Sequence, residues 1–263
     1  MMETVTAVRF DRRTDNGKTW PGLLACERAN GDDVEVVAKF SAGSERKAGG
    51  LVAEAIAAML AVDLGLPVPE PFVVALDDGF IDLVSTSDAP LAGRMRSSSR
   101  YAFGSRKLPP GFATFPASAR IPDELRAQAA EVFAFDCLIE NPDRRPENPN
   151  LLSNGRSLAI IDHELAFMTV FIGWQPPWKP GSLGTHGRGP HVLLQGLKGR
   201  TYDFTRLEST WASVTDDRLD QYRAALPAEW IATGDVASEA LAVIADVRDH
   251  IRPALAEVAR VLA

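Results

Sequence analysis

Cysteine and long apolar runs are both scarce in this 263-residue chain. Its two cysteines, Cys26 and Cys137, lie far apart in dissimilar contexts, so we expect buried thiols in a reducing compartment rather than a disulfide. No run approaches the roughly 18 apolar residues of a membrane span, and the N-terminal MMETVTAVRFDRR lacks the apolar core of a signal peptide. We therefore expect a cytoplasmic protein without a membrane span.

An excess of positive charge is also missing. Lys and Arg number 28 against 35 Asp and Glu, which gives a formal net charge of −7 and a pI near 5.2. Proteins that bind nucleic acid generally are usually basic, so nucleic acid is an unlikely partner. A hydrophobic fraction of 46% and a charged fraction of 24% are ordinary for a folded protein. No G-x-S-x-G stretch supports a hydrolase.

The first 85 residues contain mostly strand-like patterns and one helical pattern. Helical spacing of apolar residues predicts a helix over 45–64, which Gly65 caps and Pro67 ends. Alternating or apolar runs between turn residues predict five strands. These strands cover residues 3–10, 23–28, 33–40 and the two halves of 71–85, PFVVALDDGFIDLVS, which an Asp-Asp-Gly turn joins.

The composition changes after residue 85. Residues 86–121 are rich in Ser, Pro, Gly and Arg, which is typical of a linker or hinge region. The remaining predicted elements are a helix from Pro122 to Ile139, a hairpin with Asn154-Gly155 at its tip, an irregular segment over 173–190 and one long helix over 236–262. The order predicts an N-lobe over 1–85, the linker over 86–121 and a helical C-lobe over 122–263.

One loop is unusually rich in polar side chains. NPDRRPENPNLL, residues 141–152, follows the predicted helix and crowds carboxylates, amides and arginines where a plain turn needs only one or two such residues. Asp143 and Asn148 lie five residues apart in it. The strand LAII then leads to Asp162, and an Asp after so apolar a strand is costly to bury unless it has a partner.

This pattern matches what transfer of the γ-phosphoryl group of ATP requires. That reaction needs positioning and charge neutralisation rather than covalent help. One Asp accepts the proton of the attacking hydroxyl, an Asn and a second Asp hold Mg²⁺, and a strand Lys steadied by a helical Glu neutralises the phosphates. The chain offers these five residue types in order as Lys39, Glu54, Asp143, Asn148 and Asp162.

Four stretches in this order, VAKF, AEAIAAMLAVDLGLPVPEP, FDCLIENPDRRPENPNLL and AIIDHELAF, resemble the HipA-like kinases, a bacterial branch of the protein-kinase-like fold. DRRPEN is also close to the D-L-K-P-E-N form of the protein-kinase catalytic loop, and this half resembles the phosphoinositide kinases. The resemblance covers roughly residues 15–170. It implies an α+β, two-lobed protein-kinase-like fold with a β-rich N-lobe, one N-lobe helix and a mostly helical C-lobe.

The resemblance also implies a function and site residues. ATP and Mg²⁺ would bind between the lobes, and the phosphoryl group would pass to a hydroxyl, most often of a protein Ser or Thr. Lys39 would take the role of the phosphate-binding lysine, with Glu54 as its partner. Asp143 would be the catalytic base, and Asn148 and Asp162 the metal ligands.

The chain departs from the kinase pattern in three places. The first loop, DNGKTWPG, has no G-x-G-x-x-G, so phosphate contacts there would fall to the backbone around Gly17, with Lys18 and Thr19 as helpers. Asn-Pro replaces the His-Arg before the catalytic Asp, and His-Glu replaces the Phe-Gly after the metal-binding Asp. Control by a phosphorylated loop docked on that Arg, or by a Phe flip, is therefore not implied.

Plainer interpretations exist for each residue alone. Asp143 and Asn148 could be turn residues, Lys39 a solvated strand-end charge and Glu54 a surface residue. Two other functions stay open: a lipid or small-molecule kinase, and a nucleotide-binding pseudokinase that acts as a toxin–antitoxin or scaffold module. The sequence does not fix the acceptor or the oligomeric state.

The segment from Phe171 to Pro190 directly follows this motif, and we expect it to border the acceptor site. Its Trp174 and Trp178 suit either acceptor recognition or packing. His186 and His191 have no flanking Cys or His, so loop histidines are a better interpretation than a metal site. A basic cluster suits either an acidic substrate or a solvated linker, and consists of Arg94, Arg96, Arg100, Arg106 and Lys107.

Overall fold

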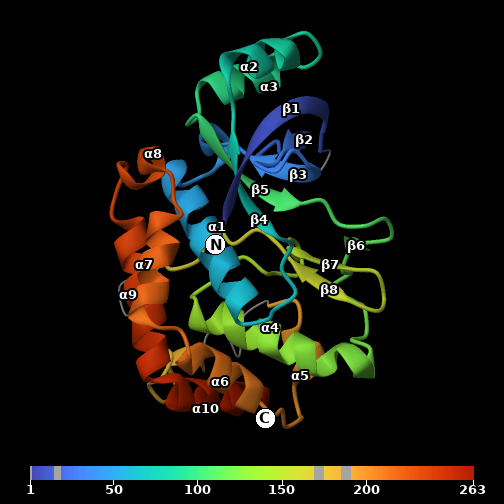
Figure 1. The fold of residues 1–263 in the computed structure, drawn as a ribbon. Coiled ribbons are helices and arrows are strands. Elements are labelled where there is room, and N and C mark those ends of the chain that lie inside the picture. The colour runs from blue at the N-terminus through green and yellow to red at the C-terminus, as the bar shows by residue number, and fades with distance from the viewer. Residues whose placement is uncertain (1, 15–18, 169–174, 185–190) are drawn as a thin grey trace. The chain divides into compact units, whose positions relative to one another are not determined.

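The computed structural model describes residues 2–14, 19–168, 175–184 and 191–263, and Figure 1 shows the elements that they form. The chain folds as two compact units. The first contains Met1–Met59, Pro69–Leu108 and Asp220–Ala237, and the second contains Leu60–Val68, Pro109–Leu219 and Ser238–Ala263. Strands dominate the N-terminal part and helices the C-terminal part, which confirms the predicted α+β class.

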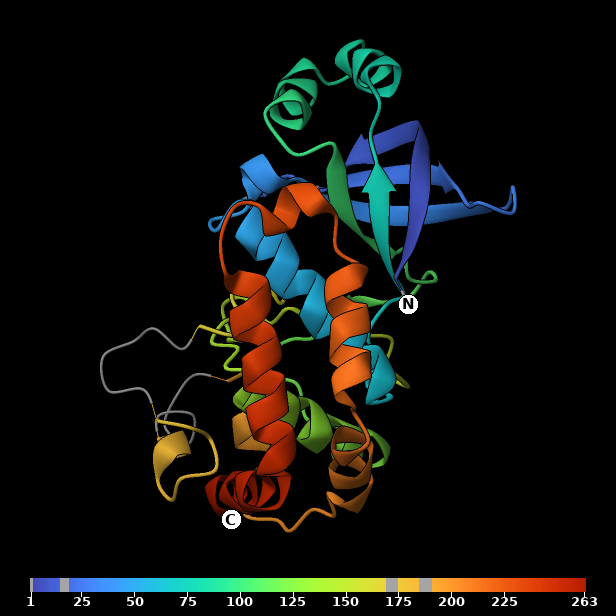
Figure 2. The ribbon, with the colours of Figure 1, turned by 60° about the vertical axis from the view of Figure 1, so that its left-hand side comes forward.

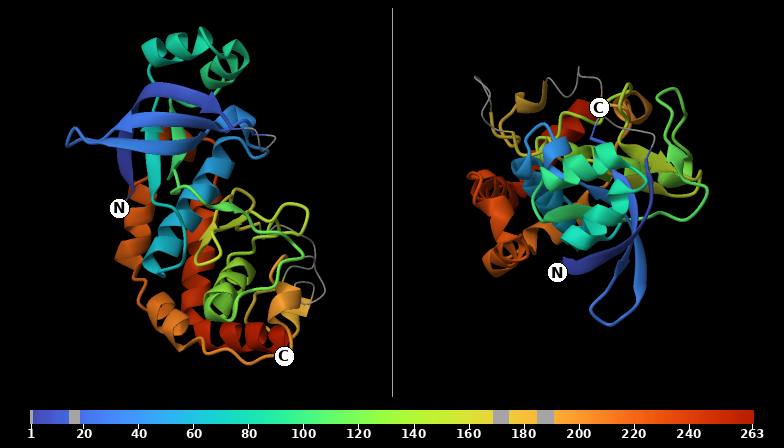
Figure 3. Two further views of the ribbon diagram at one scale, coloured as in Figure 1. Left: turned by 90° about the vertical axis from the view of Figure 1, so that its right-hand side faces the viewer. Right: turned by 90° about the horizontal axis from the view of Figure 1, so that it is seen from above.

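A closed barrel forms the core of the first unit (Figures 1 and 3). Its strands are β1 (Glu3–Arg13), β2 (Gly22–Glu27), β3 (Asp33–Lys39), β4 (Pro71–Ala75) and β5 (Tyr101–Arg106), in the spatial order β1-β2-β3-β5-β4. Neighbouring strands are antiparallel except β1 and β4, which pair in parallel and close the barrel. Along β3, Val34, Val36 and Ala38 are buried in the core, so the pleat turns Lys39 to the other face.

One predicted strand of this unit is wrong. Residues 78–85 form helix α2 (Asp78–Ser85), because Asp77 caps its first turn by accepting a 2.6 Å hydrogen bond from the Phe80 amide. Residues 86–121, expected to link two lobes, contain α3 (Ala89–Arg96), β5 and the short strand β6 (Ala113–Thr114). The fifth barrel strand is therefore β5, from the expected linker.

Helix α1 (Ala48–Asp63) confirms the helix predicted over 45–64. Every residue from Ala48 to Ala61 is buried, as expected for a helix that is apolar on all sides. Glu54 is the one charged residue in this buried stretch and is only 2% exposed. Its partner is described with the candidate site.

The second unit combines helices with a small three-stranded sheet. The sheet has the order β6-β7-β8 and includes β7 (Leu151–Ser153) and β8 (Leu158–Ile160), which confirm the predicted hairpin. Helix α4 (Arg126–Leu138) precedes it and buries nearly all of its residues. The later helices of the chain are α5 (Leu194–Leu197), α6 (Thr205–Ala212), α7 (Asp216–Ala224), α8 (Ala228–Ile231), α9 (Val236–Asp249) and α10 (Ile251–Leu262).

The single long helix predicted over 236–262 is wrong. The helix is interrupted at His250, so α9 and α10 are separate helices (Figure 2). Pro253 explains the break, because proline is accepted in the first turn of a helix but not in its interior.

Both cysteines are free and buried, as the sequence predicts. Burial raises the pKa of the Cys26 thiol to about 12 and the pKa of the Cys137 thiol well above its ordinary value. Among the described residues, none of the helices combines the length and the apolar character needed to cross a membrane.

Candidate functional site

Lys39 and Glu54 form the expected ion pair. The Lys39 Nζ donates to Glu54 Oε2 at 3.0 Å, and the two side chains are 13% and 3% exposed. Glu54 is thus not a surface residue, and Lys39 is not a solvated strand-end charge. An isolated carboxylate in so apolar a helix would be costly, so the ammonium group on β3 offsets the burial of Glu54 on α1. The pair fixes a cation at the end of a rigid strand.

The loop after α4 holds the Asp143 carboxylate with amide donors. Asp143 Oδ2 accepts from Asn148 Nδ2 at 2.8 Å and from Asn150 Nδ2 at 3.1 Å, and Asp143 Oδ1 accepts from Arg145 Nη2 at 2.9 Å. Two backbone hydrogen bonds of 3.1 Å between Arg145 and Asn148 close the turn. The turn interpretation is therefore correct for residues 145–148, while Asp143 lies before the turn and is 15% exposed.

The orientation of Asn148 follows from its partner. An ionised carboxylate accepts hydrogen bonds only, so the NH₂ group of Asn148 must face Asp143. Its carbonyl oxygen Oδ1 then points away from Asp143 and is the atom that can bind a cation. Asn148 is exposed.

Asp162 follows β8 in a left-handed conformation with φ 62°. Asn150, in the Asp143 loop, is also left-handed with φ 45°, and the Ile161 amide donates to the Asn150 carbonyl at 3.0 Å. Residues held in this region of φ cost on the order of 1–3 kcal/mol each and cluster at functional sites. The structure thus joins the residue before Asp162 to the Asp143 loop. The meeting of the Asp162 and Asn148 oxygens at one point stays a prediction.

Three buried polar residues near this loop were given no role from the sequence, which indicated only that His191 is a loop histidine. They are Asp136 on α4, Arg144 next to Asp143, and His191. Burial alone would raise the pKa of Asp136, but the charge of Arg144 and hydrogen bonds from His191 and Arg144 outweigh it and hold the pKa below its usual range. Burial lowers the pKa of His191, against the opposing effect of Asp136. The available signal was Asp136 itself, a carboxylate inside the apolar run FAFDCL.

The first loop is only partly described. Gly17 and Lys18 lie outside the described residues. The Thr19 carbonyl accepts from Arg94 Nη1 at 2.8 Å, and the guanidinium groups of Arg13 and Arg94 lie 4.6 and 4.1 Å from the Trp20 ring centroid. Cation–π contacts of this kind stabilise the ring position. The end of the loop is therefore fixed, and the roles of its glycine and lysine stay a prediction.

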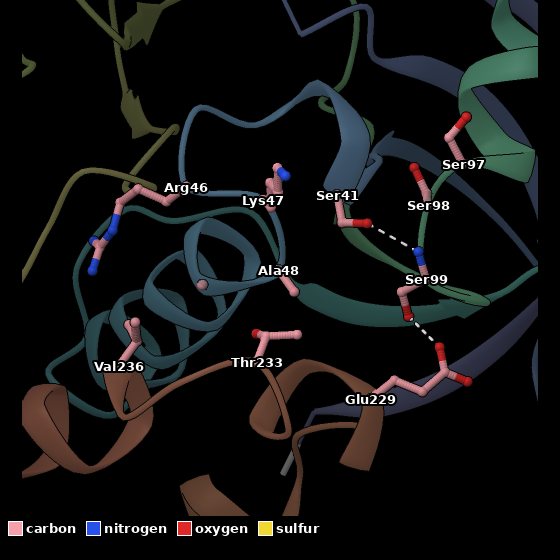
Figure 4. Close-up of a pocket in the computed structure, with 11 residues that line it drawn as sticks. Ser41, Arg46, Lys47, Ala48, Ser97, Ser98, Ser99, Glu229, Thr233 and Val236 are labelled. Atoms are coloured by element: carbon pink, nitrogen blue, oxygen red, sulfur yellow. Dashed lines mark hydrogen bonds between the residues drawn. The ribbon is translucent and has the colours of Figure 1, made fainter.

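A pocket of about 490 Å³ lies within the first unit, at the start of α1 (Figure 4). One side is held together by hydrogen bonds in which the Ser99 amide donates to Ser41 Oγ at 2.9 Å and Ser99 Oγ donates to Glu229 Oε2 at 2.6 Å. Lys39 and Glu54 are not part of its lining. These bonds connect the segment before β5 both to the chain that leads into α1 and to α8.

The remaining sequence predictions concern two tryptophans, a histidine and the basic cluster. Trp174 and His186 lie outside the described residues. Trp178 stacks on His250, with ring centroids 4.4 Å apart and an interplanar angle of 8°, so this tryptophan has a packing partner. Four members of the basic cluster are paired with nearby acids, as Arg96–Asp82, Arg100–Asp78, Arg106–Glu70 and Lys107–Glu35.

Comparison with known proteins identifies relatives of this arrangement. The family model described as HipA-like kinase matches residues 7–175. No curated protein matches the sequence. The solved structure of the Helicobacter pylori proinflammatory kinase CtkA is similar, with a TM-score of 0.51 and 12% identity, and the match covers 98% of this chain and 99% of that chain. At this identity the likeness shows the fold alone.

Proposed function

The chain belongs to the HipA-like kinase family, and from this premise we propose that it is an ATP- and Mg²⁺-dependent phosphotransferase whose acceptor is a protein Ser or Thr hydroxyl. The kinase class rests on the family. The nucleotide, the metal and the acceptor are the proposal, and the residues described above support it. The Lys39–Glu54 pair would serve the nucleotide phosphates, and the Asp143 loop would serve the acceptor hydroxyl and the metal.

The Lys39–Glu54 pair carries the proposal. An acidic residue does not make a helix that is buried on all sides more stable, because apolar side chains of similar size pack at least as well. Its presence there therefore indicates a functional role. Glu54 steadies the Lys39 ammonium group at 3.0 Å. A fixed, partly dehydrated ammonium group is what the α- and β-phosphates of a nucleotide require.

Asp143 supplies the base. The amides of Asn148 and Asn150 donate to its carboxylate and fix its direction. In phosphoryl transfer an Asp in this role accepts the proton of the acceptor hydroxyl as the oxygen attacks. Its 15% exposure leaves room for that hydroxyl to approach.

The residues present fit Mg²⁺. This cation takes oxygen ligands and commonly uses one or two protein groups together with substrate phosphates and water. The amide oxygen of Asn148 and the carboxylate of Asp162 are such ligands, and we assign both to the metal. When bound, the cation neutralises charge on the phosphates.

Label transfer from γ-labelled ATP tests the proposal. The purified chain is incubated with Mg²⁺, labelled ATP and dephosphorylated casein or cell lysate, with the Asp143→Asn variant as the matched control. We expect acid-stable label on Ser or Thr of protein with the wild type and none with the variant. Label that extracts into organic solvent would point to a lipid kinase. Nucleotide binding without transfer to any acceptor would overturn the proposal in favour of a pseudokinase.

A further inference from the structure

Two histidines mark the ends of the chain segment that follows Asp162. The polypeptide leaves the site at His163, which is fully buried, and returns at His191, which is 9% exposed. Neither side chain carries a role in the chemistry proposed above. Both nevertheless contact the same pair of buried charges.

That pair is Asp136 and Arg144. The Arg144 guanidinium donates through Nε to Asp136 Oδ2 at 2.5 Å and through Nη2 to Asp136 Oδ1 at 3.1 Å. The side chain of Arg144 is 0% exposed and that of Asp136 is 1% exposed. A two-bond contact of this kind fixes the orientation of both groups, and α4 provides the rigid base for it.

The two histidines contact opposite members of the pair. His163 Nε2 lies 3.0 Å from Arg144 Nη2, and because a guanidinium has donors only, Nε2 must accept. His191 Nδ1 accepts from the Leu193 amide at 3.2 Å, so the proton of this ring lies on Nε2, which donates to Asp136 Oδ2 at 3.1 Å. Each contact has one chemically consistent direction.

Backbone bonds extend the same arrangement. Arg144 Nη1 donates to the carbonyl of Asn150 and, at 3.4 Å, to that of Ile161. The Val192 amide donates to the Arg144 carbonyl at 2.9 Å. Arg144 therefore contacts the loop that contains Asp143, the residue before Asp162 and the residue after His191.

We propose that the buried Asp136–Arg144 pair is a clamp that fixes both His163 and His191 to the Asp143 loop, so that the two ends of the intervening segment keep one register relative to the catalytic base. His163 and His191 are positioning residues in this scheme. The clamp is a statement about the fold, while its effect on transfer rests on the proposed function.

Ordinary core packing is the competing explanation for His191, since its ring also meets Phe133 edge-on at 4.8 Å. Packing predicts that a change at His191 loosens only its own surroundings. A clamp predicts that the same change also loosens the other end, around Ile161 and His163, because both ends depend on one ion pair. The two explanations therefore differ in where the structure responds.

Hydrogen exchange of the full chain without nucleotide measures this. The variants are His191→Leu, which removes the donor to Asp136, and His191→Gln, which keeps an N–H donor of similar reach. Leu193→Ala is the matched control, because the Leu193 side chain is fully buried at the same end and apolar, and the substitution keeps the backbone amide that donates to His191. Exchange is followed in peptides that cover 160–168 and 191–197.

We expect His191→Leu to speed exchange in both peptides by at least about tenfold, the factor that corresponds to losing one hydrogen bond to a charged group. His191→Gln should restore slow exchange at 160–168, and Leu193→Ala should speed exchange only at 191–197. Unchanged exchange at 160–168 in His191→Leu would overturn the clamp, whatever the enzyme does.

A second measurement links the clamp to transfer. With casein and γ-labelled ATP, His191→Leu should lower kcat by roughly tenfold or more and leave the KM for ATP within about twofold, as expected for a misplaced base with intact nucleotide contacts. His191→Gln should recover most of kcat. If exchange responds at both ends but the wild type transfers no label, the clamp stands and the proposed function fails.

Discussion

Variants that remove the charge of Lys39 should lose activity whether or not they lose stability. In Lys39→Met the Glu54 carboxylate stays inside α1 without the ammonium group that lies 3.0 Å away in the native protein. Breaking a fully buried ion pair by removing one partner costs about 3–5 kcal/mol. Lys39 is 13% exposed, so water can approach the carboxylate and we expect a smaller loss of roughly 2–3 kcal/mol.

This loss of stability should be large enough to measure and small enough for the protein to stay folded. For a chain of this size each kcal/mol shifts Tm by about 2–4 °C, so Lys39→Met should melt roughly 4–12 °C below the wild type and still fold. The double variant Lys39→Met, Glu54→Leu replaces both charges with apolar groups, and such replacements of buried pairs are often neutral. We therefore expect it to recover most of the lost Tm.

Activity should not recover with stability. Both variants lack the fixed cation for the phosphates, so label transfer should fall by at least about 100-fold in each, the usual loss when a charge-stabilising group is removed. Calorimetry and the γ-labelled ATP assay, run on the same samples, test the two parts. Wild-type transfer by Lys39→Met would refute the role of Lys39, and a double variant no more stable than the single one would refute the burial argument.

Four further predictions follow from single groups. Asp143→Asn should slow single-turnover label transfer by about 10²–10⁴-fold, the usual contribution of a general base, with nucleotide affinity unchanged in an equilibrium titration. Trp178→Ala should lower Tm because its ring stacks on His250; lost transfer at an unchanged Tm would instead identify an acceptor-binding role. Burial lowers the pKa of His191, so the unfolded chain takes up the extra proton first, and the urea midpoint should fall as pH drops below the ordinary pKa of about 6.5; His191→Gln should flatten that fall. Because burial raises the pKa of Cys26 to about 12, iodoacetamide at about pH 8 should modify it at least about 100-fold more slowly in the native than in the unfolded protein, and equal rates in peptide mapping would contradict this.

Local pattern was enough to predict the elements whose stability is local. The strands β1 to β3, helix α1 and the β7–β8 hairpin all follow from periodicity and turn residues. At the hairpin tip, Gly155 has φ 83° and Asn154 Oδ1 accepts from the Arg156 and Ser157 amides. These two residues fix the turn without help from the rest of the chain.

The prediction was wrong for a short segment in which one residue type suits two structures. Asp77 suits a turn between strands and equally the start of a helix, and an eight-residue segment is too short to show a decisive period. The Asp77 cap and the packing of Phe80, Ile81 and Val84 into the core of the first unit together favour the helix. Pro253, in contrast, was a sufficient signal for a break near His250 that the apolar pattern concealed.

The residues of the candidate site could be predicted from the sequence where their order along the chain and their predicted elements indicated a role. Lys39 and Glu54 were identified from their elements, and their contact is present. Asp136, Arg144 and His191 were not, because a residue 55 positions from its partner, as His191 is from Asp136, has no local signature. Only the cost of burying the Asp136 charge indicated that some partner had to exist.

The edges of the two sheets restrict how other chains can attach. β1 closes the barrel through Glu3–Thr6, and its remaining part, Arg9–Arg13, is rich in charge, which discourages an added strand. In the small sheet, the Ile160 amide of β8 donates to the Pro67 carbonyl at 2.7 Å, and β6 is only two residues long. The described strands therefore offer no long open edge as a template. We expect protein acceptors and further copies of this chain to be recognised through side chains rather than by strand addition.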